Sequence, residues 1–293
     1  MSQAGAYISG VLGPAYTATI QLDVNGSQTN DTTLASAASN FNSSFPGNGF
    51  DSAGDVQRKI LGNPDPSPGA DGVVDWNFED FVWQTGNVFQ PGEIDFLNTA
   101  IHELTHAIGF ASDIAQNGNS GFGDTPGNPS AWSPFDQFVA DAMGSIIDSN
   151  GVLDGARWNA ASIGGAGAGG LQFNGPFAVA ANGGNPVYLY SPTTWSPGSS
   201  GSHLDTDVYN GTGGTIENMM NHASTLSEGL DIREYTAIEL GMLCDIGYNQ
   251  APACAAIPEP SAFWCFGILA AGVVGWKRLA SLRRFHIDMK AKF

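Results

Sequence analysis

Basic residues are scarce in this sequence: its 293 residues include 10 lysines and arginines against 28 aspartates and glutamates. Six of the ten basic residues lie after residue 257, where two acidic residues oppose them. Residues 1–257 therefore carry a net charge of −22. Such an acidic chain repels nucleic acid and anionic membrane surfaces, so DNA and RNA are excluded as expected partners of this part.

Cysteine is also rare, with three residues in the chain. None of them belongs to a CxxC pair, so the usual signature of a structural zinc site is missing. Cys265 lies in an apolar segment near the carboxyl end, whereas Cys244 and Cys254 are ten residues apart across an expected helix end and loop. In an exported protein this pair is suited to a disulfide, and two free thiols are the alternative.

The amino terminus lacks a secretory signal. Residues 1–16, MSQAGAYISGVLGPAY, have neither the basic start nor the apolar run of a signal peptide. Low lysine together with abundant Gly, Asn, Ser and Thr is nevertheless typical of extracellular proteins. We therefore expect an exported protein whose export signal is not contained in this sequence.

A long apolar run is missing as well. The segment AFWCFGILAAGVVGW (262–276) has fifteen uncharged residues, whereas a helix that spans a bilayer needs about 20. It is followed by KRLASLRR, and a basic flank is typical of the cytoplasmic side of a membrane anchor. A buried core helix is the alternative, but a basic flank in an otherwise acidic protein favours the anchor.

This tail resembles a bacterial sorting signal. IPEP (257–260), the short apolar segment and the arginine-rich end are together similar to the PEP-CTERM signal, with which bacteria hand proteins to an exosortase. The resemblance implies that residues 258–293 form a sorting or transmembrane tail that contacts the membrane. It also implies an exosortase-type machinery as a partner, and the bacterial cell surface or extracellular matrix as the destination.

Hydrophobic periodicity predicts both strands and helices in residues 1–257. Residues 17–24 alternate between apolar and polar, as in a half-buried strand. From Glu93 to Phe110, apolar residues recur every three or four positions, which predicts an amphipathic helix that ends at Gly109. The other predicted elements are a helix at 31–41 capped by Asp31, strand structure at 72–83, a helix at 133–143, and a helix that begins with an Asp231–Glu234 capping box and ends at Gly247.

The helix at 93–110 contains the motif HELTH (102–106). Residues four apart lie on one face of a helix, so His102 and His106 can both offer an imidazole nitrogen to one Zn²⁺ ion. Glu103 is rotated by about 100° from His102 and can reach a water at the metal as its general base. Two histidines placed by chance are the alternative, which the position of the motif at the polar edge of the helix disfavours.

A catalytic zinc site needs a third protein ligand and an open position. Ser112 is a poor zinc ligand, whereas Asp113 could serve after a sharp chain turn. His203 in GSHLD and His222 in MMNHAS are the other candidates in the acidic part. His286 lies beyond the apolar tail segment and is excluded. The residues by themselves leave the third ligand open.

The order of motifs resembles the leishmanolysin-like branch of the metzincin zinc proteases. It consists of HExxHxxGF, a long insertion, a GSHL segment, a methionine–asparagine turn and a helix that ends in DIGY. In that branch an inserted segment displaces the third histidine downstream, which implies His203 as the ligand, with Asp113 as the alternative. It further implies a chain turn at Gly109 and a methionine turn beneath the metal, best matched by Met220, with Met219 as the alternative.

The resemblance covers about residues 93–248 and implies an α+β fold. We expect a metzincin-like catalytic domain at 1–257 with a twisted, mostly parallel mixed sheet of four or five strands and the active-site helix packed on it. Its amino-terminal subdomain would comprise about residues 1–113. A carboxy-terminal subdomain, about 114–250, would supply His203, the methionine turn and the last helix.

These features predict a secreted or surface-anchored zinc endopeptidase in which Glu103 activates water for attack on a peptide bond. Its substrate would be a protein or peptide, and the acidic chain favours basic ones. A non-catalytic surface or matrix protein on the same fold is the alternative, and hydrolysis of another kind of amide is a third. The sequence identifies no residue that stabilises the oxyanion. Loops rich in Asp, Gly and Asn could hold Ca²⁺, although EF-hand and RTX spacings are absent.

Overall fold

The computed structural model describes residues 1–26, 32–41, 47–64, 68–122, 126–210, 218–223 and 232–257. The chain divides into the units Met1–Ile257 and Pro258–Phe293, and the second unit, with the expected sorting tail, lies outside the described residues. Among the helices that are described, none is long and apolar enough to cross a membrane.

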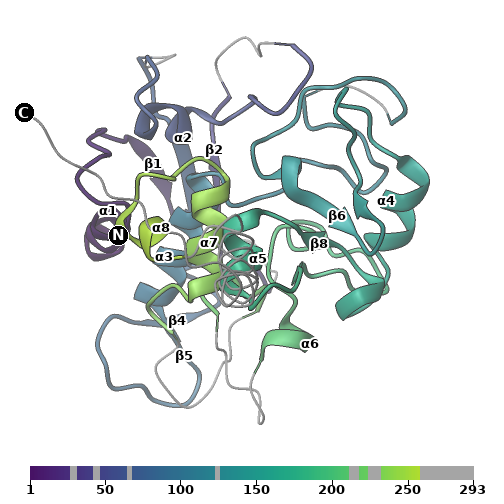
Figure 1. Ribbon diagram of the computed structural model, residues 1–293. Helices are drawn as coiled ribbons and strands as arrows, with labels where there is room; N and C mark the ends of the chain where they lie inside the picture. Colours follow the sequence, from purple (N-terminus) through teal and green to yellow (C-terminus); the bar gives the residue numbers. More distant parts are fainter. Residues whose placement is uncertain are drawn as a thin grey trace, which may run out of the picture. The chain divides into compact units, whose positions relative to one another are not determined.

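Three strands form the sheet beside helix α3 (Phe96–Ala107) (Figure 1). In sheet order they are β1 (Leu22–Asn25), β3 (Gly72–Trp76) and β2 (Ala35–Ser39). β1 runs parallel to β3, and β2 runs antiparallel to it at the edge. Residues of β3 are alternately buried and half-buried, as its sequence pattern requires. The α+β class is confirmed, but the expected sheet of four or five mostly parallel strands is wrong, because the other strands pair in separate sheets.

Residues 31–41, predicted as a helix, contain strand β2 instead. Its ladder pairs Ala35 with Trp76 and continues along the whole of β3. Pairing with a neighbouring strand overrides the helix preference of this alanine- and serine-rich segment. The predicted cap, Asp31, lies outside the described residues, and the first strand begins at Leu22 rather than at residue 17.

Helix α3 (Phe96–Ala107) carries the predicted metal motif and packs on the sheet. Its N-cap is Asp95, whose carboxylate accepts hydrogen bonds from the N–H groups of Leu97 and Asn98. The helix ends before Gly109, which has a φ of 101°, a conformation that favours glycine. The prediction of a helix that stops at this glycine is confirmed, although the helix begins later than predicted.

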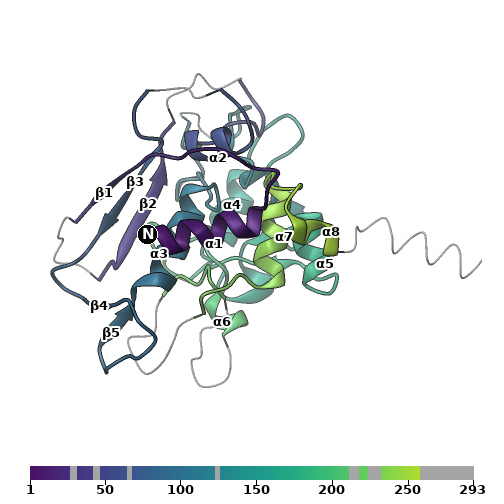
Figure 2. The ribbon, with the colours of Figure 1, turned by 90° about the vertical axis from the view of Figure 1, so that its left-hand side faces the viewer.

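The elements around α3 include some that the sequence pattern did not reveal. Helix α1 (Ser2–Leu12) packs against α3 (Figure 2). Its buried residues recur at every fourth position: Ala4, Ile8 and Leu12. Strands β4 (Val82–Gln84) and β5 (Glu93–Asp95) form a parallel pair of their own. The first residues of the predicted helix are therefore extended, because they pair with β4.

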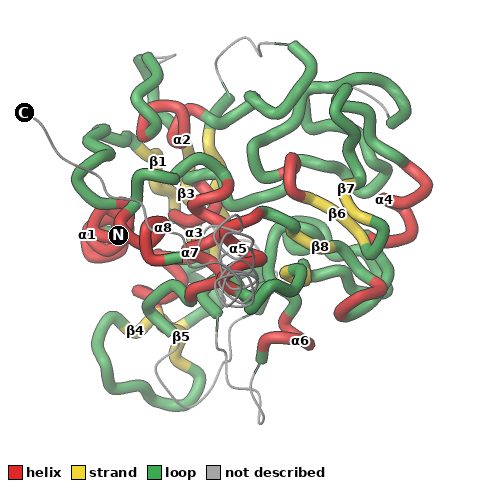
Figure 3. Tube along the Cα trace, viewed as in Figure 1, coloured by secondary structure: helices red, strands yellow, loops and turns green. Residues whose placement is uncertain are grey.

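Residues 126–210 contain a small antiparallel sheet and long loops (Figure 3). In sheet order the strands are β7 (Gly144–Ser145), β6 (Val139–Asp141), β8 (Gln172–Phe173) and β9 (Val187–Tyr188). The helix predicted at 133–143 is wrong: a 3₁₀ turn, η1 (Asp136–Phe138), leads directly into β6. All residues of β6 are buried, as in a strand covered on both faces. The helices of this region are α4 (Gly155–Ala161), η2 (Gly167–Gly169), α5 (Pro176–Ala181) and α6 (Thr206–Tyr209).

Helix α7 (Ala237–Asp245) packs closely on α5, near the centre of Figure 1. Its capping box is formed by Thr236 and Glu239 rather than by Asp231 and Glu234. Asp231 lies outside the described residues, so the predicted box is replaced by the one directly before the helix. Gly247, with a φ of 124°, follows the helix end as predicted.

Cys244 and Cys254 form a disulfide that joins α7 to α8 (Pro252–Ala256), which decides between the two alternatives. Changing both cysteines to alanine is expected to lower the free energy of unfolding by about 2–3 kcal/mol, because the unfolded chain is no longer closed into a short loop. Urea unfolding of the variant, and of wild type under reducing conditions, measures this loss. An unchanged midpoint in both samples would contradict the prediction.

Candidate metal centre

Three histidines from two distant parts of the chain meet in the structure. His102 and His106 lie one turn apart on α3, and their Nε2 atoms are 3.1 Å apart. His203 lies in the loop between β9 and α6. Its Nε2 is 3.1 Å from that of His102 and 3.0 Å from that of His106. These residues, the histidine cluster, could hold a metal ion.

A backbone carbonyl holds each ring of the cluster at its other nitrogen. A carbonyl oxygen only accepts, so each Nδ1 carries the proton and each Nε2 keeps a lone pair. Three lone pairs that face one another at such short range repel unless a cation lies between them. The acceptors and their distances from Nδ1 are Met219 (2.8 Å, for His102), Phe110 (2.7 Å, for His106) and Ser199 (3.0 Å, for His203).

Burial keeps the histidine cluster uncharged. It lowers the pKa of His102 to about 4 and the pKa of His106 to about 3. It also lowers the pKa of His203 well below the usual value. All three rings are therefore neutral at pH 7, which is the form that binds a metal. The cluster offers three neutral nitrogen ligands, one fewer than the four ligands of a tetrahedral zinc ion.

The chain turn after α3 supplies one of the carbonyl acceptors. The positive φ of Gly109 turns the chain so that the carbonyl oxygen of Phe110 returns to His106. A Cβ at Gly109 would lie 2.7 Å from Oε1 of Gln57 in α2 (Asp55–Ile60). Gly109 thus makes the turn that the sequence predicted, for reasons of both conformation and space.

Asp113, the alternative third ligand, is not part of the histidine cluster. Its N–H lies 3.3 Å from both carboxylate oxygens of Asp136. Burial, followed by the charge of Asp136, raises the pKa of Asp113 to about 8. The hydroxyls of Ser112 and Ser133 donate to the Asp136 carboxylate, each at 2.8 Å. These contacts tie the loop after α3 to η1, a connection that the sequence spacing did not reveal.

Glu103 is buried between α3 and β2, where the backbone N–H of Ala37 donates to its carboxylate. Burial raises the pKa of Glu103 to about 8, and this hydrogen bond opposes the shift. Without a metal, Glu103 is therefore mostly protonated at pH 7, and a nearby cation would favour its ionised form. Sequence reasoning missed Ala37, because a backbone donor leaves no mark in the side-chain pattern.

Strand β2 has one edge that does not pair with β3. Successive residues of an antiparallel strand alternate: one directs its backbone N–H and C=O groups to the neighbouring strand, and the next directs them away from it. Asn40 donates its N–H to the carbonyl of Asp71, so even-numbered residues bond across to β3. Ala35 and Ala37 therefore direct their N–H and C=O groups away from the sheet. This edge is the one beside Glu103.

Of two consecutive methionines, Met219 contacts the histidine cluster through its backbone and Met220 contacts the residue next to it in the chain. The carbonyl of Met219 accepts from His102, and the carbonyl of Met220 accepts from Leu204 at 2.9 Å, the residue after His203. Both side chains are buried, and the sulfur of Met219 lies 3.8 Å from Nδ2 of Asn98. The methionine turn predicted from the sequence thus lies next to both parts of the chain that supply the histidines, helix α3 and the loop that contains His203.

Glu239 of α7 holds this methionine turn. Its buried carboxylate accepts from the N–H of Met220 at 2.6 Å and from the N–H of Met219. It also accepts from the N–H and hydroxyl of Thr236. Burial raises the pKa of Glu239 to about 7, against the effect of these bonds. Sequence reasoning did not connect Glu239 with the site, because the contact spans 19 residues of chain.

Replacing Glu239 by glutamine is expected to lower the free energy of unfolding by about 2–5 kcal/mol, because one amide oxygen cannot accept all of these donors. We also expect metal affinity to fall by about 10- to 100-fold, because the turn supplies the acceptor for His102. Thermal unfolding and metal titration measure the two effects. Glu234→Gln, at an exposed position on the same segment, is the matched control. Equal behaviour of the two variants would refute this role of Glu239.

No family model, no curated protein and no solved structure matches this chain. The resemblance to leishmanolysin-like metzincins therefore depends on the sequence motifs alone.

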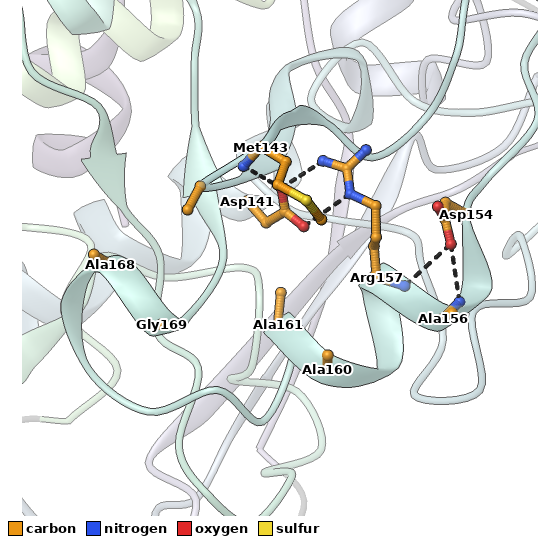
Figure 4. A pocket seen from close by; sticks show the side chains of 10 residues that line it. Asp141, Met143, Asp154, Ala156, Arg157, Ala160, Ala161, Ala168 and Gly169 are labelled. Atoms are coloured by element: carbon orange, nitrogen blue, oxygen red, sulfur yellow. Dashed lines mark hydrogen bonds and ion pairs between the residues drawn. The ribbon is translucent and has the colours of Figure 1, made fainter.

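A hollow beside α4 and β6 offers no free charged group (Figure 4). Its volume is about 370 Å³, and none of the three histidines lines it. The guanidinium of Arg157 bonds to the carboxylate of Asp141. Asp154 caps α4 by accepting from the N–H groups of Ala156 and Arg157. Because its charged groups are already paired, we assign no ligand to this hollow.

Proposed function

We propose that this protein is a zinc-dependent endopeptidase of the leishmanolysin-like metzincin type. The observation that carries the proposal is the convergence of three Nε2 lone pairs at helix α3, which also carries a buried glutamate, Glu103, directly after His102. A metal with a purely structural role needs no general base beside it. Glu103 therefore favours catalysis over the alternative of a non-catalytic surface protein.

The donor set suits zinc. Three histidines with one open position are a common ligand set of catalytic zinc sites. Zn–N bonds of about 2.0–2.1 Å at tetrahedral angles separate the nitrogens by about 3.3 Å, which is close to the 3.0–3.1 Å between the Nε2 atoms here. When bound, zinc would polarise a substrate carbonyl and lower the pKa of a water molecule to about 7.

Glu103 would serve as the general base and then as the general acid. Its carboxylate takes one proton from the attacking water, whose oxygen bonds to the carbonyl carbon of the peptide. It then gives this proton to the amide nitrogen as the C–N bond breaks, so the amine leaves in neutral form. The N–H of Ala37 orients the carboxylate through these steps.

The edge of β2 that faces away from β3 supports a peptide as the substrate. An extended peptide can bind to an unpaired strand edge through main-chain hydrogen bonds. Because the N–H of Ala37 already donates to Glu103, a peptide on this edge would pair with Ala35 and pass next to the general base. The net charge of −18 favours basic peptides.

A location at the bacterial cell surface or in the extracellular matrix is also part of the proposal. It is supported by the resemblance of residues 257–284 to a sorting signal, and it implies an exosortase-type partner and membrane contact through the tail. The acidic, lysine-poor composition of residues 1–257 is consistent with an extracellular protein.

The test combines metal analysis with proteolysis of the full chain. Elemental analysis after chelator-free purification should find one zinc per chain, and casein should be hydrolysed at neutral pH. Removal of the metal with 1,10-phenanthroline should stop hydrolysis, and added Zn²⁺ should restore it. A chain that holds zinc but cleaves neither casein nor a basic peptide library would rule out the proposal.

A further inference from the structure

His222 has no role in the proposed function, yet its ring stacks on Tyr190, whose N–H donates to the carbonyl of His203 at 2.9 Å. Leu204 pairs with Leu189 on one side and with Asn221 on the other, so three short segments form a ladder. Side chains alternate between the two faces of a ladder, and paired residues share a face. The three paired residues are all buried. Their chain neighbours therefore lie on the opposite face, where His203 is opposite Tyr190 in the antiparallel pair and His222 is opposite Asp205 in the parallel pair.

Contacts on this face hold the ring of His222. It stacks on Tyr190, with ring centroids 3.6 Å apart and an interplanar angle of 13°. Its Nδ1 lies 2.9 Å from the hydroxyl of Thr206. The charge of His222 contributes to the lowered pKa of His203, which agrees with their closeness. Two independent contacts thus fix the orientation of the His222 ring.

The other nitrogen of His222 has no partner among the residues that the structure describes. Within the described part of the chain, its Nε2 makes no hydrogen bond. There the hydroxyl of Thr206 likewise has no acceptor other than Nδ1 of His222. If this hydroxyl donates to Nδ1, the proton of the neutral ring is on Nε2. Burial lowers the pKa of His222, so the ring is neutral at pH 7 and presents one unused N–H.

We infer that His222 donates a hydrogen bond from Nε2 to the carbonyl oxygen of the substrate and stabilises the charge of the oxyanion. This inference rests on the proposed function and supplies the oxyanion donor that the sequence did not identify. His222 forms no covalent bond and transfers no proton, since Glu103 handles the proton of the water. The stack on Tyr190 fixes the donor in advance, which makes such a hydrogen bond effective in catalysis.

The first experiment compares three variants of the full chain with wild type. His222→Phe keeps an aromatic ring for the stack but removes the N–H, whereas His222→Gln restores a side-chain donor. His286→Phe, which changes the histidine of the tail, is the matched control. We expect one zinc per chain in every variant. For His222→Phe, kcat should fall about 100-fold with little change in KM, and His222→Gln should recover about a tenth of wild-type kcat or more.

The second experiment measures a property other than activity. In the Co²⁺-loaded protein, acetohydroxamate binding is followed by visible absorption, because its anionic oxygen provides the charge that an N–H donor would stabilise. His222→Phe is expected to weaken this binding about tenfold, and His222→Gln should bind more tightly than His222→Phe. The His286→Phe control should bind as wild type does.

The outcomes distinguish the inference from the proposed function. If wild type cleaves peptides and His222→Phe keeps kcat within about twofold, the inference is refuted and the proposed function is not. If the metal-loaded wild type cleaves nothing, the proposed function fails. Acetohydroxamate then decides: weaker binding by His222→Phe supports a donor at the metal, and equal binding refutes it. A wild-type chain that binds no metal refutes both.

Discussion

Replacing His203 by alanine is expected to remove the bound metal and the peptidase activity together. The variant keeps only the two ligands on α3, His102 and His106. Loss of an outer hydrogen-bond partner already weakens metal binding by about 10- to 100-fold, so loss of a direct ligand should cost more than about 100-fold. Elemental analysis of the full-length variant should therefore find almost no zinc, and casein hydrolysis should fall to background.

The matched control is Asp113→Asn, which alters the other candidate for the third ligand. Asp113 lies beside Asp136, outside the histidine cluster, so this variant should keep both its metal and its activity. Circular dichroism of both variants verifies that each is folded. The reverse pattern, with metal lost from Asp113→Asn and kept by His203→Ala, would mean that the ligand set is wrong.

The parts of the fold that the sequence predicted correctly are local. Helix α3 has its cap, its apolar period and its terminal glycine within one continuous stretch, and neighbouring residues suffice to specify it. The i, i+4 spacing of His102 and His106 belongs to the same helix. Helix α1 also had a local signal, since Ala4, Ile8 and Leu12 recur at helical spacing, but the small and polar residues between them obscured it.

The elements that were predicted wrongly depend on distant partners. Strand β2 has an alanine- and serine-rich sequence with a helical preference, and it is extended because β3 lies beside it. The segment 139–141 likewise becomes a strand because β7 and β8 pair with its two edges. Nothing within these short stretches marks them as strands, so a window of local sequence could not identify them.

The candidate site combines both kinds of information. His203 is 101 residues from His102, and the resemblance to a family with a displaced histidine was needed to choose it among the candidate ligands. Ala37 donates its backbone N–H to Glu103, and Glu239 accepts from the backbone N–H of Met220. No sequence motif encodes such contacts. His222 was visible as a histidine, but its role follows from the ladder around Leu204, which exists only in the folded chain.

Replacing Glu103 by glutamine is expected to reduce kcat by about 10²- to 10⁴-fold while the metal stays bound. The glutamine oxygen can still accept from the N–H of Ala37, so the packing between α3 and β2 is kept. The amide cannot take a proton from water, so the general base is lost. Single-turnover peptide cleavage and zinc content measure the two properties. The exposed Glu79 provides the control Glu79→Gln, which should match wild type in both.

A second consequence of Glu103→Gln concerns the pH dependence of stability in the metal-free protein. The pKa of Glu103 is about 8 in the folded chain against an ordinary 4.5, so between these values the folded state binds more protons than the unfolded state. Stability contributed by this group therefore falls as the pH rises through that range. The variant lacks this contribution and should lose less stability than wild type between about pH 5 and pH 8. Contributions of Asp113, Asp136 and Glu239 are common to both chains and cancel in the comparison. If the free energy of unfolding changed with pH equally in both chains, Glu103 would not be a buried, protonated acid in the metal-free protein. The proposal that a bound cation ionises Glu103 and so makes it a base would then lose its physical basis.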